Sequence, residues 1–147
     1  MGAGFMNLPS FGIPALCALA VTFAAPAQSE TAQGAHVSLE LNALEPVDGA
    51  CRISFLIQNG HDSDIARAVY EAVLFDTEGR VDRMTLFDFG NLPAARPRVR
   101  QFLVPGLICS DLGRLLINGA ETCEAASPGA CTQDLHLRSR TEVEIIG

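Results

Sequence analysis

The stretch EAVLFDTEGRVDRMTLFDFG, residues 71–90, decides the fold class. On both sides of TEGR short runs rich in apolar and β-forming residues are bounded by turn residues, which is typical of β-strands. Gly79 lies where a tight turn needs a residue that tolerates a positive φ. The stretch therefore predicts a β-hairpin, with its first strand beginning near Ala68.

Apolar residues recur with a period of two on both sides of the hairpin. Five more strands are predicted, at 36–44, 51–60, 99–106, 114–120 and 135–145. About seven short strands separated by turns predict an all-β fold, a single antiparallel immunoglobulin-like β-sandwich over residues 35–147. One alternative is that residues 63–75 begin as a helix, with Ser63 or Asp64 as N-cap, but the valine-rich end and the EGR turn favour a strand.

The N-terminal residues 1–27 carry no charged side chain. Their apolar centre is too short for a comfortable membrane span and contains Pro14. Ala25-Pro26-Ala27 matches the small-x-small pattern of a secretory cleavage site. Residues 1–27 are therefore predicted to be a signal peptide and residues 28–34 a flexible linker, with an uncleaved N-terminal anchor as the alternative. We expect a periplasmic or secreted protein that is not stably inserted in the membrane after cleavage.

Charge and cysteine content limit the partners and the chemistry. The net charge of −7 argues against nucleic acid and anionic membranes as partners. Removal of Cys17 with the signal peptide leaves an even number of cysteines in an exported chain, which predicts two disulfides among Cys51, Cys109, Cys123 and Cys131. The alternative, a zinc site, is disfavoured because even the nearest pair encloses seven residues, in CEAASPGAC.

Three runs carry a family resemblance: EAVLFDTEGRVDRMTLFDFG, RPRVRQFLVPGLIC (96–109) and LLINGAETC (115–123). The chain resembles a group of small secreted proteins of Gram-negative bacteria that are often labelled only by a twin-arginine signal. The hairpin is similar to the FxLYD-type immunoglobulin-like domains of bacterial envelopes. This resemblance implies an exported β-sandwich without an established activity. The sequence departs from the twin-arginine label, since no arginine precedes Arg52.

The direction of the strands predicts which cysteines pair. If seven strands alternate in direction, their connections alternate between a top end, where the first strand starts, and a bottom end. Cys51 and Cys109 then both lie at the bottom end, and Cys123 and Cys131 both lie at the top end. The predicted disulfides are therefore Cys51–Cys109 and Cys123–Cys131.

The histidines offer a weak case for a metal site. His36 and His136 both begin strands at the top end and come close if the first and last strands pair in parallel. His61 lies in a loop at the same end, with Asp62 and Asp64. Nitrogen and carboxylate ligands of this kind suit a divalent cation. The alternative, three independent solvated histidines, is favoured, and no metal or cofactor is predicted.

Arg96, Arg98 and Arg100 share one face at the start of the fifth strand, in a register continued by Phe102 and Val104. Guanidinium groups bind carboxylates and phosphates through paired hydrogen bonds. The alternative is that the three are the solvated outward face of a strand and pair with acids of this chain, namely Asp88, Glu142 or Glu144.

The function predicted is binding rather than catalysis. The sequence has no G-x-S-x-G elbow and no glycine-rich phosphate loop, and its cysteines are expected to be oxidised. A protein of the envelope is the expected partner, with a small anionic ligand or a metal second and an enzyme third; the oligomeric state stays open. The predicted contact surface is the top end, with His61, Asp62, Asp64, Arg96, Arg98 and Arg100.

Overall fold

The computed structural model describes residues 1–2, 4 and 34–147. Nearly all of the predicted signal peptide and of the predicted linker therefore lies outside the described residues. No helix in the described part of the chain is long and apolar enough to cross a membrane.

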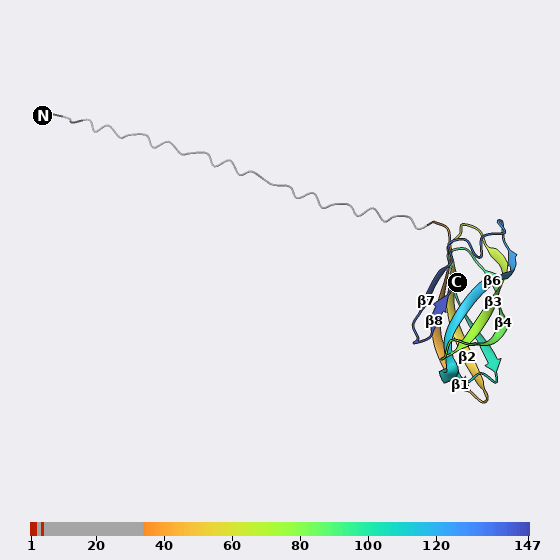
Figure 1. Ribbon diagram of the computed structural model, residues 1–147. Helices are drawn as coiled ribbons and strands as arrows, with labels where there is room; N and C mark the ends of the chain where they lie inside the picture. Colours follow the sequence, from red (N-terminus) through yellow and green to blue (C-terminus); the bar gives the residue numbers. More distant parts are fainter. Residues whose placement is uncertain (3, 5–33) are drawn as a thin grey trace. The chain divides into compact units, whose positions relative to one another are not determined.

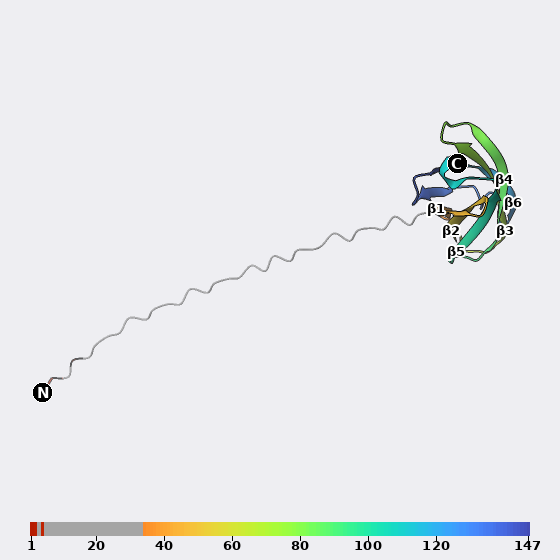
Figure 2. The ribbon, with the colours of Figure 1, turned by 90° about the horizontal axis from the view of Figure 1, so that it is seen from below.

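The described domain is all-β and consists of two packed sheets of four strands (Figures 1 and 2). The strands are β1 (Val37–Val47), β2 (Ala50–Asn59), β3 (Ile65–Asp76), β4 (Val81–Leu92), β5 (Pro97–Pro105), β6 (Leu112–Glu124), β7 (His136–Ser139) and β8 (Glu144–Ile146), with a 3-10 turn at Cys109–Asp111. The segment 63–75, for which a helix was the alternative, is a strand from Ile65 onward. The β3–β4 hairpin turns at Gly79, whose φ is +81°.

The order of strands is β5-β2-β1-β7 in the first sheet and β4-β3-β6-β8 in the second. The inward side chains of both sheets form one core, in which Phe55, Tyr70, Phe87 and Phe89 are the largest fully buried side chains. The rings of Phe87 and Phe89 lie 5.4 and 5.5 Å from that of Phe55, so aromatic contacts join the two sheets.

The C-terminal segment departs from the prediction of one strand over 135–145. The chain bends between Ser139 and Glu144, so β7 joins the first sheet and β8 the second. The Ser139 and Thr141 hydroxyls accept hydrogen bonds from the backbone N–H groups of Thr141 and Val143, both at 3.1 Å, and such local bonds compete with a strand ladder. The sandwich therefore has eight strands rather than seven. It is also not purely antiparallel, because β7 pairs in parallel with β1 and β8 with β6.

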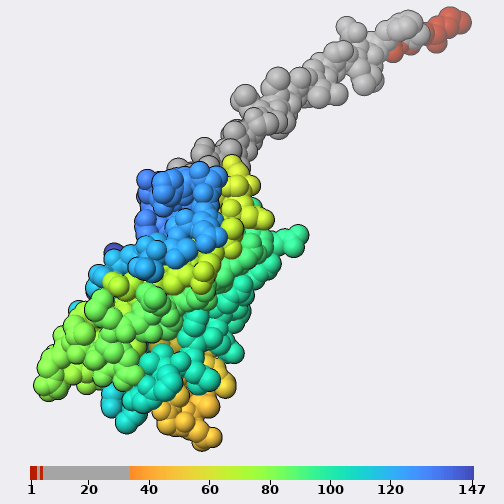
Figure 3. Space-filling model, turned by 90° about the vertical axis from the view of Figure 1, so that its right-hand side faces the viewer, coloured from red at the N-terminus to blue at the C-terminus, as the bar shows by residue number. Residues whose placement is uncertain are grey.

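Both predicted disulfides are confirmed, Cys51–Cys109 at the bottom end and Cys123–Cys131 at the top end. Figure 3 shows the loop near residues 125–130 (blue) beside residues 60–65 (yellow) at one end of the sandwich. At the opposite end it shows the turn near residue 48 (orange) beside the residues that follow β5 (teal). The alternation of strand directions up to β7 thus gathers the loops at the two ends as expected.

Candidate functional site

The top-end loops are held together by the buried side chain of Asn59. Its amide nitrogen donates to the carbonyl oxygens of Ser63 and Leu92, both at 2.9 Å, and its Oδ1 accepts the backbone N–H of His61 at 2.9 Å. The His61 Nε2 lies 2.8 Å from the carbonyl oxygen of Ala130. The loops after β2, β4 and β6 therefore form one surface, as predicted, with His61 serving to link two of them.

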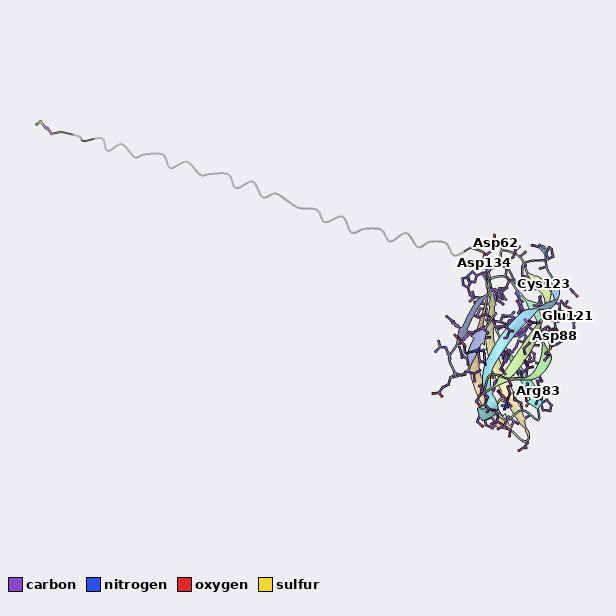
Figure 4. All side chains as sticks on the ribbon, viewed as in Figure 1. Asp62, Arg83, Asp88, Glu121, Cys123 and Asp134 are labelled. Atoms are coloured by element: carbon purple, nitrogen blue, oxygen red, sulfur yellow. A yellow bond between two sulfur atoms is a disulfide. The ribbon has the colours of Figure 1, made fainter. Side chains whose placement is uncertain are left out.

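The two aspartates of the GHDSD loop differ in their contacts. Asp64 accepts the backbone N–H of Ala94 at 2.8 Å and so holds the segment that leads to Arg96. Asp62 is exposed at the top end, where Figure 4 labels it. Asp64 thus positions the loop, and both aspartates are exposed.

Carboxylates neutralise most of the ten arginines. Seven form ion pairs, which are Arg52–Glu45, Arg67–Asp88, Arg80–Asp76 and Arg80–Glu78, Arg83–Asp82, Arg114–Glu144, Arg138–Glu40 and Arg140–Glu40. The hydrogen bond from Arg67 lowers the pKa of Asp88. Within the described residues, Arg96, Arg98 and Arg100 are the three arginines without a carboxylate partner. The alternative that these three pair with Asp88, Glu142 or Glu144 is therefore wrong.

The orientation of Arg98 and Arg100 also differs from the expectation of a solvated outward face. Both are half-buried and alternate along β5 with the exposed Val99, Gln101 and Leu103. Their side of the strand continues into Phe102 and the buried Val104, so it faces the other sheet. The two arginines extend the inward register of β5 beyond the point where the core ends.

Arg100 is used within the fold. Its Nε donates to the carbonyl oxygen of Phe89 at 2.8 Å, and its Nη2 donates to that of Asn91 at 3.2 Å. Arg98 donates only to the carbonyl oxygen of Pro97, at 3.1 Å. The side chain of Arg96 is exposed and makes no hydrogen bond to the described residues. Arg96 and Arg98 thus remain available for an external anion.

The facing edges of β4 and β5 form what we call the seam. Phe102 closes it from inside, with its ring 4.6 Å from that of Phe87 and 5.2 Å from that of Phe89. Arg83 donates from β4 to the carbonyl oxygen of Pro105 at 2.8 Å. A groove of about 350 Å³ runs along the seam between residues 83–87 and 101–105.

Exposed apolar side chains concentrate at this seam. Five large apolar residues on the two strands are more than half exposed: Val81, Met84, Leu86, Val99 and Leu103. Sequence reasoning missed them, although Met84 and Leu86 occupy the face of β4 opposite to that of Phe87 and Phe89. The sequence did contain a signal for this exposed apolar surface, because apolar residues occupy both faces of β4.

Two of the three histidines lie in contact with each other, and the third does not join them. His36 and His136 stack with their ring centroids 4.0 Å apart, as the parallel pairing of β1 and β7 requires, whereas His61 is engaged by Ala130. Within residues 34–147 no group of three or more His, Cys, Asp or Glu side chains is arranged to hold a metal ion. The divalent-cation hypothesis has no geometric support.

Comparison with known protein families finds no match, and comparison with curated proteins finds none. Among solved structures, IrmA from Escherichia coli is similar to this chain, with a TM-score of 0.58 and 13% sequence identity over 70% of this chain and 91% of IrmA. At that identity the likeness concerns the fold alone. It supports the two-sheet architecture and leaves the resemblance to small secreted proteins without a family match.

Proposed function

We propose that this protein is an extracytoplasmic, non-catalytic binding module whose contact surface is the seam with Arg96 and Arg98. One observation carries the proposal. The three arginines without a carboxylate partner in the described part of the chain all belong to β5 or its start, beside the exposed apolar residues of the same seam. The two disulfides fit an oxidising compartment, the periplasm or the exterior of the cell.

Within this proposal the sandwich is classed as immunoglobulin-like. The support is that strands which do not follow one another in the sequence pair with each other: β2 pairs with β5, and β3 pairs with β6. These are the pairings made by strands B and E and by strands C and F of immunoglobulin domains. Such domains carry many unrelated binding functions, so the class permits the proposed role and does not specify a partner.

A partner protein fits this surface better than a membrane or nucleic acid does. Protein interfaces combine apolar and aromatic groups at the centre with arginine, and they are depleted in lysine and acids. The β5 edge of the seam has this composition, with the exposed Val99 and Leu103 alternating along the strand with Arg98 and Arg100. An acidic, apolar patch on an envelope protein is the complement we propose.

The partner docks through side chains rather than by adding a strand to β5. Pro97 and Pro105 begin and end this edge strand, and proline lacks the N–H that a new ladder needs. Across the seam, Arg100 and Arg83 already occupy carbonyl oxygens of Phe89, Asn91 and Pro105. We therefore expect affinity to depend on Leu103, Val99 and the two available arginines.

Site-specific photocrosslinking in the periplasm tests the proposal. A photoreactive residue at Leu103 should give a discrete crosslinked product, and the double substitution Arg96→Glu and Arg98→Glu should abolish it. Arg114→Glu is the matched control, because Arg114 is also an exposed strand arginine but pairs with Glu144 on the β6–β8 side of the sandwich. A product that persists in the double variant, or that is lost equally in the control, contradicts the proposal.

A second candidate function is binding of a small carboxylate or phosphate ligand by the same arginines. The observation in its favour is again that Arg96 and Arg98 contact no carboxylate among the described residues. A thermal shift with small carboxylates or phosphates, lost in the Arg98→Glu variant, would support it. A crosslinked protein at Leu103 without any such shift would favour the partner protein.

A further inference from the structure

A polar hollow of about 430 Å³ lies at the top end of the first sheet. It opens where β7 runs parallel to the start of β1. Its lining residues are His36, Ser38, Gln58, Gly60, His136, Leu137 and Arg138. We call it the histidine hollow. Its lining extends from β7 across β1 to Gln58 and Gly60 at the end of β2, and Gln58 pairs with Pro97 of β5.

The stacked rings define the chemistry of the hollow. His36 Nδ1 lies 2.7 Å from the carbonyl oxygen of Gly34, and since a carbonyl only accepts, Nδ1 carries the proton. In the neutral ring, Nε2 is therefore the atom with the free lone pair. The rings of His36 and His136 are inclined by only 23°, so lone pairs in their planes do not converge on one cation.

The lining is positive although the protein is acidic. Arg138 is its only permanently charged residue, and no carboxylate lines the hollow. The Nε of Arg138 lies 2.6 Å from Glu40 Oε2, which leaves the two terminal nitrogens of the guanidinium without a partner among the described residues. Ser38 and Gln58 add a hydroxyl and an amide as neutral donors.

The other charged groups around the pair are few. Glu40 on β1 is shared between Arg138 and Arg140, so it is already neutralised. Asp62 and Asp134 lie in loops at the same end, as Figure 4 shows, but neither lines the hollow. The permanent charge facing the two imidazoles inside the hollow is therefore that of Arg138.

From this geometry we infer that the histidine hollow binds a small oxyanion, a phosphate or carboxylate group, and that binding is coupled to protonation of His36 and His136. A protonated imidazole donates from both nitrogens, whereas the neutral ring of His36 offers only a lone pair at Nε2. An anion between these rings and Arg138 offsets the repulsion between neighbouring positive charges. The anion therefore binds more tightly when the two rings are protonated. The inference does not depend on the function of the seam.

Nuclear magnetic resonance of the histidine rings tests this inference. The purified protein is titrated with inorganic phosphate and, separately, with succinate, at pH 6 and at pH 8. We expect saturable shifts at His36 and His136 with no shift at His61, whose Nε2 contacts Ala130. Affinity at pH 6 should exceed that at pH 8 by about tenfold or more, as one linked proton predicts. Comparing the two titrations distinguishes a phosphate ligand from a carboxylate ligand.

Two arginine variants separate binding from folding. Arg138→Gln should abolish the shifts at His36, whereas Arg140→Gln should preserve them, because Arg140 contacts the same Glu40 but does not line the hollow. His136→Gln should weaken binding and reduce its dependence on pH. Equal shifts at all three histidines, equal affinity at the two pH values, or equal losses in the two arginine variants would overturn the inference.

Discussion

Arg100 on β5 donates its Nε to the carbonyl oxygen of Phe89 on β4 at 2.8 Å and so joins the free edges of the two sheets. The bond lies just above the contact between Phe102 and Phe89, where the apolar core ends. A second bond, to the carbonyl oxygen of Asn91, extends the link toward the top end. The edge of the sandwich is therefore closed by a guanidinium group rather than by another strand.

Replacement of Arg100 by methionine should destabilise the protein. Methionine retains most of the hydrocarbon but none of the donors, so the partly buried carbonyl oxygen of Phe89 loses its partner. We expect the free energy of unfolding in urea to fall by about 1–2 kcal/mol. Arg96→Met is the control and should change it by less than about 0.5 kcal/mol, since Arg96 is exposed. Equal losses in both variants would contradict the assigned role.

Tyr70 should stay protonated until the protein unfolds in alkali. It is the only tyrosine and there is no tryptophan, so its ultraviolet absorbance is readily followed. Its hydroxyl donates to the carbonyl oxygen of Cys131 at 2.6 Å, and burial raises the pKa of Tyr70 far above its ordinary value. Because the folded-state pKa is the higher one, the stability from this group is complete below about pH 10, the unfolded value, and is lost as the pH rises above it.

The measurement is a parallel titration of tyrosinate absorbance and circular dichroism. The two transitions should coincide, and tyrosinate that forms near pH 10 in protein with native circular dichroism would refute the buried hydrogen bond. Tyr70→Phe should cost about 1–2 kcal/mol at neutral pH, because the carbonyl oxygen of Cys131 then loses its donor.

The apolar alternation located β1 to β6, and the alternation of strand directions was enough to pair the cysteines. The apolar alternation failed to predict the end of β7, where Ser139 and Thr141 interrupt the inward apolar face that includes Leu137 and Val143. Two hydroxyl residues in succession on a core-facing register indicate a bend, because their side chains bond to the local backbone. That signal was present in the sequence, and it accounts for the eighth strand and its parallel pairing with β6.

The role of the arginines could not be predicted from alternation. Alternation shows that Arg98, Arg100 and Phe102 share a face, but it does not show that β5 is an edge strand opposite β4. Only the strand order supplies the carbonyl oxygens of Phe89 and Asn91 as partners. The meeting of His36 and His136 was predicted only on the condition that the first and last strands pair in parallel, as β1 and β7 do.

Glu40 should contribute stability that is lost in acid. Hydrogen bonds from Asn42 and Arg140, with the charge of Arg138, lower the pKa of Glu40. A carboxyl with a depressed folded-state pKa stabilises the fold above its unfolded value, about 4.3, and this contribution disappears as the pH falls through the folded value. Both arginines are two-thirds exposed, so solvent screens the pair and we expect less than about 1 kcal/mol.

Hydrogen exchange of β7 measures this effect locally. Glu40→Gln should speed exchange of the β7 amides and remove the extra acid sensitivity that we expect in the parent protein between about pH 5 and pH 3. Glu45→Gln is the control, because Glu45 forms a longer exposed pair with Arg52, at 3.7 Å, and does not contact β7. If β7 exchanges equally fast in both variants, Glu40 does not hold this strand.

The two disulfides should stabilise the protein unequally. Cys51–Cys109 joins residues 58 positions apart, whereas Cys123–Cys131 joins residues only 8 apart. Loop-closure entropy then predicts about 4 kcal/mol for the longer ring and about 2.5 kcal/mol for the shorter one. Replacing each pair by serines and measuring urea unfolding should reproduce this order.

The shorter disulfide should nevertheless have the larger local effect at the top end. Cys131 accepts the hydrogen bond of Tyr70, and the neighbouring Ala130 contacts His61, so opening this ring frees the partners of both side chains. We expect the Cys123→Ser and Cys131→Ser double variant to keep its sheet circular dichroism while tyrosinate forms at lower pH than in the parent protein. A larger loss of global stability from the short ring than from the long one would show that chain entropy does not set the order.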